Sequence, residues 1–163
     1  MKKRTNILII ISLVTLLSGC NMGSQNELSG VDLPLEQMNN DLTLIAPPEL
    51  NEFDTGKYVG FVLANNANTP IILSANYGIH LYQLANNEWM PIEDIMDYGN
   101  EEKIIYPISE GSFQEVVLVA HPKVEMKDKP VTVRVVVVGK YLLANGNIGD
   151  EVGAYVDITL PPK

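Results

Sequence analysis

The chain has 163 residues, 46% of them hydrophobic, and a formal net charge of −9. This length suits one folded domain rather than two. The acidic balance argues against nucleic acid as a partner, because its phosphates would repel the chain. Cys20 is the only cysteine. No disulfide can therefore form within the chain, and a packed core must stabilise the fold.

The first 19 residues have the three-part order of an export signal. A basic start at residues 2–4 is followed by an apolar run at residues 7–17, which is interrupted only by Ser12 and Thr15. The run has 11 residues, whereas a helix that crosses a membrane needs about 20. We therefore expect residues 1–19 to be a cleaved signal peptide rather than a permanent membrane span.

The end of this segment, Leu17-Ser18-Gly19-Cys20, resembles the lipobox of bacterial lipoproteins. The resemblance implies cleavage between Gly19 and Cys20 and attachment of a diacylglycerol to the Cys20 thiol. One acyl chain binds a membrane reversibly, whereas two or three make the attachment lasting. The resemblance thus implies an extracytoplasmic protein that is lipid-anchored to the bacterial membrane through Cys20.

Residues 20–40 are predicted to be the lipidated cysteine and a flexible tether. Asn, Gln, Ser, Gly and Glu dominate this stretch, and its apolar residues follow neither a helical nor an alternating period. One partly ordered piece is expected at residues 31–38. The folded domain is expected over residues 41–163.

Within that domain, short runs of β-branched and aromatic residues alternate with turn formers. The expected strands cover residues 42–46, 57–65, 70–73, 77–84, 89–92, 112–120, 131–138 and 152–160. Asn86-Asn87 predicts a hairpin, and residues 70–73 are expected at a sheet edge. The nearly continuous apolar run at 131–138 predicts a central strand covered on both sides. Its odd-numbered valines should share one face, with Thr132, Arg134, Val136 and Val138 on the other.

Seven or eight short strands without an amphipathic helix predict an all-β fold, an antiparallel β-sandwich. A closed barrel is the alternative. The layout over residues 58–160 resembles the immunoglobulin-like modules of bacterial envelope proteins, including a type related to an intracellular proteinase inhibitor of Bacillus. The resemblance is carried by Asn65-Asn66, Pro70-Ile71-Ile72, Trp89, Pro107 and Glu110-Gly111. It implies an immunoglobulin-like sandwich, although no cysteine pair brackets Trp89.

Patterns that support catalysis or metal binding are sparse. After the signal, the chain contains only two histidines, His80 within an expected strand and His121 before a proline. No serine lies in a Gly-x-Ser-x-Gly elbow, and a zinc site needs three or four suitable ligands. We therefore expect no enzyme, no cofactor and no metal site.

Two polar clusters have weaker alternatives. The acidic residues between the hairpin and residue 103 are interpreted as a solvated loop, with a glycosidase carboxylate pair as the alternative. They are Glu93, Asp94, Asp97, Glu101 and Glu102. The second cluster is interpreted as a turn, with a calcium loop as the alternative. Its oxygen-bearing residues are Asn145, Asn147, Asp150 and Glu151, with Gly146 and Gly149 between them.

Four aromatic residues around the predicted hairpin are the binding candidates: Tyr77, Tyr82, Trp89 and Tyr98. Flat rings near a loop can stack on sugars or peptides, and core packing is the alternative. The leading hypothesis is a lipid-anchored, non-catalytic module that binds an envelope protein, peptide or glycan. An inhibitor or regulator of an extracytoplasmic enzyme such as a protease is the alternative, and an enzyme is the third hypothesis.

Overall fold

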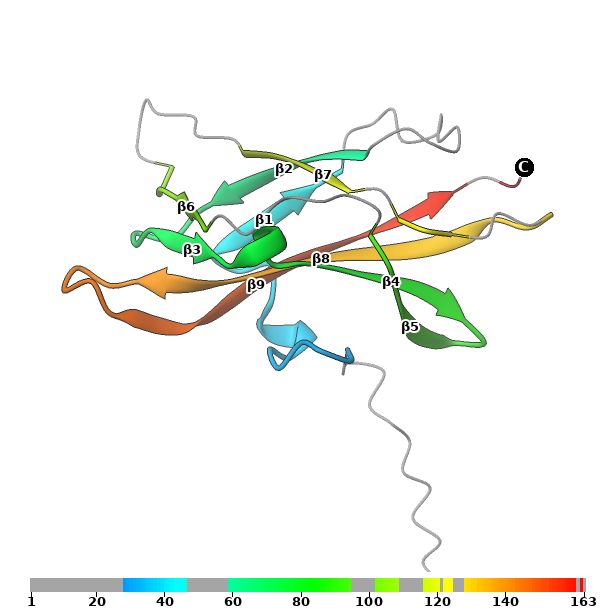
Figure 1. The fold of residues 1–163 in the computed structure, drawn as a ribbon, viewed down its shortest axis with the longest axis horizontal. Coiled ribbons are helices and arrows are strands. Elements are labelled where there is room, and N and C mark those ends of the chain that lie inside the picture. Colours follow the sequence, from blue (N-terminus) through cyan, green and yellow to red (C-terminus); the bar gives the residue numbers. More distant parts are fainter. Residues whose placement is uncertain are drawn as a thin grey trace, which may run out of the picture.

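In a computed structural model, residues 28–46, 59–94, 102–108, 116–120, 122–124, 128–160 and 162 are described. They form two antiparallel β-sheets that pack as layers (Figure 1). The smaller sheet has the order β1-β2-β7, with strands Leu42–Ile45, Val59–Asn65 and Val116–Ala120. The predicted antiparallel β-sandwich is confirmed.

The larger sheet is built on its long central strand β8, Val131–Leu142. Strand β9, Ile148–Leu160, pairs along one edge of β8. The other edge is shared by β3, Ile71–Leu73, and β4, Ile79–Ala85, which pair with successive parts of β8. Beyond them lie β6, which pairs with β3, and β5, which pairs with β4; their bounds are Lys103–Ile105 and Glu88–Ile92. Because β3 and β4 share one edge of β8, and β6 and β5 lie beyond them, the six strands of the larger sheet form four rows. The three strands of the smaller sheet form three more rows.

The short 3₁₀ turn Ala75–Gly78, η3, joins β3 to β4 and lies against β8. Asn76, Tyr77 and Gly78 all have positive φ angles. A Cβ atom on Gly78 would lie 1.9 Å from the Val138 carbonyl oxygen, so only glycine fits there. The edge position predicted for residues 70–73 is wrong, because β3 pairs with β8 on one side and β6 on the other.

The main core fills the space between the two sheets. The odd-numbered valines of β8 point into it, as their alternation predicts. They meet Leu42 and Leu44 of β1 and Phe61 and Leu63 of β2, all of them buried. The hairpin predicted at Asn86-Asn87 is also present, with both residues at positive φ. That geometry is typical of a tight two-residue turn.

Residues 28–40, which we call the strap, cross the outer face of the six-stranded sheet. Figure 1 shows the strap on the side of this sheet opposite β1, β2 and β7. Leu28, Leu35 and Met38 are buried there and pack with Tyr82 of β4 and Val136 of β8. The strap therefore supplies a second apolar cluster, separate from the main core.

Hydrogen bonds fix the strap at both ends. The Tyr82 hydroxyl donates to the Ser29 carbonyl oxygen over 2.7 Å. Near the other end, the Asn39 backbone N–H donates to the Gly153 carbonyl (3.0 Å), and the Tyr155 N–H donates to Asn39 Oδ1 (2.9 Å). The sequence predicted a tether over residues 20–40 with one partly ordered piece at 31–38, whereas the described part of this stretch packs on the sheet from residue 28 to residue 39. Residues 28–40 are therefore part of the domain, because the apolar outer face of the sheet needs a cover.

The strap generates a stability prediction. Leu28 is only 5% exposed, so Leu28→Ala should lower the free energy of unfolding by about 2–4 kcal/mol through lost burial and a residual cavity. Ile45→Ala is the matched control, because Ile45 is 53% exposed and its truncation should cost about 0.5 kcal/mol or less. Urea denaturation measures both. Equal, small effects would show that the strap does not contribute to the fold.

The contact of Gly78 with β8 generates a second prediction. Gly78→Ala should destabilise the domain by about 3 kcal/mol or more, since it combines positive φ with a steric clash against backbone. Gly146→Ala is the control. Gly146 also has positive φ, but a Cβ there would meet nothing within 4 Å, so the loss should be about 1 kcal/mol. Similar urea midpoints for the two variants would contradict the close packing of η3 on β8.

Candidate functional site

Arg134 is the one charged residue on the apolar stretch Val131–Val138 of β8. It points to the outer face of the sheet and is 8% exposed. Its Nε donates to Asp157 Oδ1 over 2.6 Å and its Nη2 donates to Asp157 Oδ2 over 2.7 Å. The β8–β9 register pairs these two residues directly. This bidentate geometry fixes the guanidinium plane and neutralises its charge.

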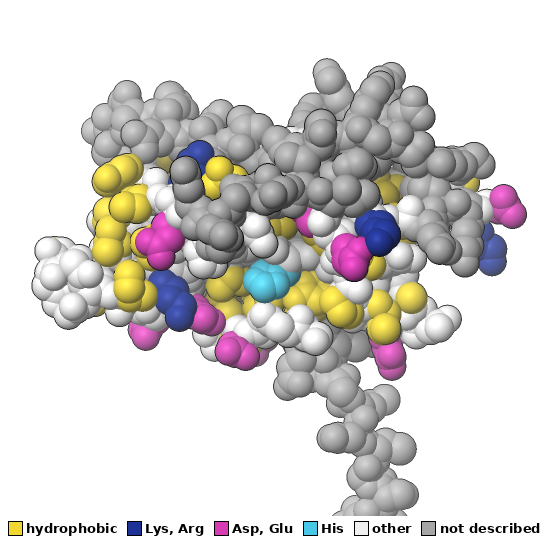
Figure 2. All heavy atoms as spheres, in the orientation of Figure 1, with side chains coloured by type: hydrophobic (Ala, Val, Ile, Leu, Met, Phe, Trp, Pro, Cys, Tyr) yellow, Lys and Arg dark blue, Asp and Glu magenta, His cyan; other side chains and the backbone are white. Residues whose placement is uncertain are grey.

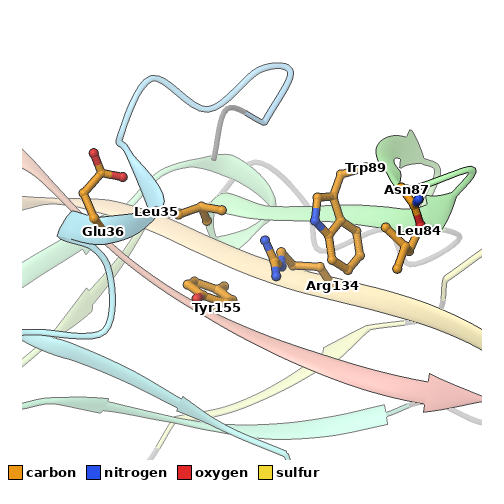
Figure 3. A pocket seen from close by; sticks show the side chains of 7 residues that line it. All are labelled: Leu35, Glu36, Leu84, Asn87, Trp89, Arg134 and Tyr155. Atoms are coloured by element: carbon orange, nitrogen blue, oxygen red, sulfur yellow. The ribbon is translucent and has the colours of Figure 1, made fainter. Parts of the chain in front are cut away.

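Two aromatic rings flank this guanidinium. Its central carbon lies 4.1 Å from the centre of the Trp89 ring and 4.4 Å from the centre of the Tyr155 ring. Figure 3 shows Arg134 between Trp89, which comes from β5, and Tyr155, which comes from β9. Both contacts are within the range of a cation–π interaction. Strands β5, β8 and β9 thus each contribute one member of a fixed stack.

A cavity of about 510 Å³ opens beside this stack, and we call it the outer-face pocket. Its lining comes from the strap, the β4–β5 hairpin and the stack: Leu35, Glu36, Leu84, Asn87, Trp89, Arg134 and Tyr155 (Figure 3). Leu84 is 39% exposed and offers apolar surface to solvent. The volume of the cavity falls within the range of small-ligand pockets, and its lining combines aromatic, apolar and polar side chains.

The polar groups of the outer-face pocket are unevenly placed. Asp157 takes two of the five N–H groups of the Arg134 guanidinium. The others are donors that water or a ligand can use. Glu36 is exposed on the strap, and its carboxylate is directed away from Arg134 in Figure 3. Asn87 stands at the opposite end of the pocket, on the hairpin turn.

The four aromatic candidates from sequence do not form one site in the structure. Trp89 lines the outer-face pocket. Tyr82 packs in the same outer cluster but is buried, and this burial raises the pKa of its hydroxyl to about 12. Tyr77 packs against the main core, with Lys103 Nζ 5.3 Å from its ring centre. Tyr98 lies outside the described residues, as does Cys20.

Arg134 and Tyr155 are not among the candidates from sequence. The one available signal was a single arginine on the otherwise apolar outer face of the strongest strand. Tyr155 gave none, because a tyrosine in a strand is common in any β-protein. Only the pairing of β8 with β9 brings the two side chains together.

His80 lies in a different cavity on the outer face, of about 500 Å³. Burial lowers the pKa of His80 below its usual range. Asp32, Glu102, Glu151 and Lys140 also line this cavity. His121, like Asp97 and Glu101, lies outside the described residues.

Acidic and basic side chains are interspersed over the face of the molecule seen in Figure 2, and the remaining clusters make structural contacts. Lys123 Nζ lies 2.6 Å from Glu93 Oε2 at the surface, and this hydrogen bond lowers the pKa of Glu93. In the β8–β9 turn, Asn145 Oδ1 accepts the backbone N–H of Asn147 over 3.0 Å. Across the described segments, no group of three or more His, Cys, Asp or Glu residues is arranged to hold a metal ion. No helix in this part of the chain is long and apolar enough to cross a membrane.

The ion pair at the stack generates a third prediction. Asp157→Asn removes the counter-charge of a nearly buried guanidinium and should cost about 2 kcal/mol of unfolding free energy. Glu151→Gln is a control on the same strand. Glu151 lies 3.5 Å from Lys140, and both side chains are at least a third exposed, so its loss should cost about 0.5 kcal/mol or less. Urea denaturation compares them, and an equal loss would contradict a special role for the Arg134 pair.

The functional interpretation of this site rests on its geometry. No family model, curated protein or solved structure matches the chain.

Proposed function

We propose that the protein is a lipid-anchored, extracytoplasmic binding module of the bacterial cell envelope that acts without catalysis. The outer-face pocket is its ligand site, and this pocket is the observation that carries the proposal. Its side chains are of the types that dominate binding energy, namely Trp, Tyr and Arg. The guanidinium is already held by Asp157 and two rings, so little side-chain freedom would be lost on binding.

The anchor is supported by the lipobox at Leu17-Ser18-Gly19-Cys20. The strap begins only eight residues after Cys20, and eight extended residues span at most about 29 Å. A lipid on Cys20 would therefore hold the start of the strap within roughly that distance of the membrane. Because the strap lines the outer-face pocket, the ligand would be met close to the membrane surface.

Site-specific photo-cross-linking in living bacteria tests the proposal. A photoreactive residue replaces Leu84 at the pocket or, as a matched control, Ile45. Both are exposed leucine-sized residues on strands, and Ile45 is not among the residues that line the pocket. We expect a discrete adduct with an envelope protein, peptide or glycan from position 84 only.

The anchored and unanchored forms complete the test. Cys20→Ala should release the protein from the membrane fraction and reduce the adduct at position 84. Identical adducts from positions 84 and 45, or none from either, would contradict a binding function for the pocket. A Cys20→Ala protein that stays with the membranes would contradict the lipid anchor.

A further inference from the structure

We infer that the ligand of the outer-face pocket is an uncharged saccharide. This inference rests on the proposed function and names the ligand class of the same site. It follows from which charges the pocket can accept, from where the pocket lies on the sheet, and from the hydrogen-bonding groups at its rim.

Anionic ligands fit the pocket poorly. The positive charge of Arg134 is already neutralised by two hydrogen bonds to Asp157. Glu36 adds a carboxylate at the rim, and the whole chain has a net charge of −9. A phosphate or carboxylate ligand would thus meet a site and a protein whose field repels it. An anionic polymer is excluded on the same ground.

Cationic ligands meet a different obstacle. Cation binding in aromatic pockets uses the electron-rich faces of the rings. In this pocket the protein's own guanidinium, 4.1 Å from Trp89 and 4.4 Å from Tyr155, occupies those contacts. A ligand ammonium would have to lie beside Arg134, where like charges repel.

An extended peptide lacks the backbone partners that it normally uses. Peptides that add to a sheet pair with the backbone of an edge strand. The pocket lies on the face of the sheet, where β4 pairs with β5 and β8, and β8 pairs with β4 and β9. Toward β9, Asn39 of the strap holds the backbone groups of Gly153 and Tyr155. The edge strand β5 contributes only Trp89 to the lining, so the pocket offers mainly side chains.

Hydroxyl groups match these side chains. Arg134 donates hydrogen bonds, the Glu36 carboxylate accepts them, and the Asn87 amide does both. A hydroxyl group can also do both, so the hydroxyl groups of an oligosaccharide that spans the pocket can satisfy all three kinds of partner. The apolar C–H face of a sugar ring would lie on Leu84, which is exposed and lines the pocket. An uncharged saccharide therefore satisfies the charge, the polar groups and the apolar surface together.

Trp89 is the only tryptophan of the chain and lies in the pocket, so its fluorescence reports binding directly. The full chain in detergent is titrated with uncharged tetrasaccharides of glucose, galactose, mannose and N-acetylglucosamine. Tetragalacturonate and tetralysine serve as charged probes. At least one uncharged probe should change the emission saturably, with an affinity at least tenfold higher than either charged probe. No saturable change, or equal affinity for a charged probe, would overturn the inference.

The hairpin turn provides matched variants. Asn86 and Asn87 are neighbours and both have positive φ, so glycine should preserve the turn at either position. Only Asn87 lines the pocket. Asn87→Gly should weaken saccharide binding about three- to tenfold through a lost hydrogen bond, while Asn86→Gly should leave it unchanged. Equal affinities of the two variants would overturn the assigned contact.

The cross-linking test of the proposed function and the fluorescence test of the saccharide inference can give negative results independently of each other. A protein or peptide adduct from position 84, with no saccharide response of Trp89, would overturn the saccharide inference and leave the proposed function standing. The absence of both signals would overturn both. A saccharide response together with a carbohydrate-containing adduct at position 84 would support both.

Discussion

Strand β8 is apolar on both faces, and each face needs a cover. The valines at odd positions point into the space between the sheets, where β1 and β2 meet them. Val136 and Val138 point the opposite way, and a second sheet on that side is absent from the described part of the chain. The strap takes that place. Burial of apolar surface by its three buried residues stabilises the fold by about 25 cal/mol per Å². The need to cover this face of β8 therefore ties the strap to the domain.

The same constraint explains the position of the candidate site. A strap is narrower than a sheet and covers the outer face incompletely. The outer-face pocket and the cavity around His80 both lie on this face, and strap residues line each of them. Arg134 is the one charged residue on the apolar stretch Val131–Val138, and Asp157, Trp89 and Tyr155 compensate for its burial. The packing of the fold and the position of the candidate site thus both follow from the two apolar faces of β8.

Much of this could be predicted from the sequence, because the responsible patterns are local. Alternation assigned the faces of β8, and Asn86-Asn87 marked the hairpin. Of the strap, only a partly ordered piece at residues 31–38 was predicted. Its packing on the sheet could not be predicted, since Leu28, Leu35 and Met38 follow no period and are buried only by distant strands. Residues 70–73 were misplaced because strand order depends on non-local pairing. The stack depends on the β8–β9 register, which one sequence does not reveal.

The contacts of Asn39 have a consequence for molecules crowded together on a surface. Open strand edges are templates on which another copy can pair, and proteins that expose them tend to aggregate. Strand β9 lies at such an edge, and Asn39 occupies the backbone groups of Gly153 and Tyr155 there. Under the proposed lipid anchor, neighbouring copies on a membrane would collide edge to edge far more often than in dilute solution. By occupying these two backbone groups, Asn39 would reduce pairing between copies at this part of β9.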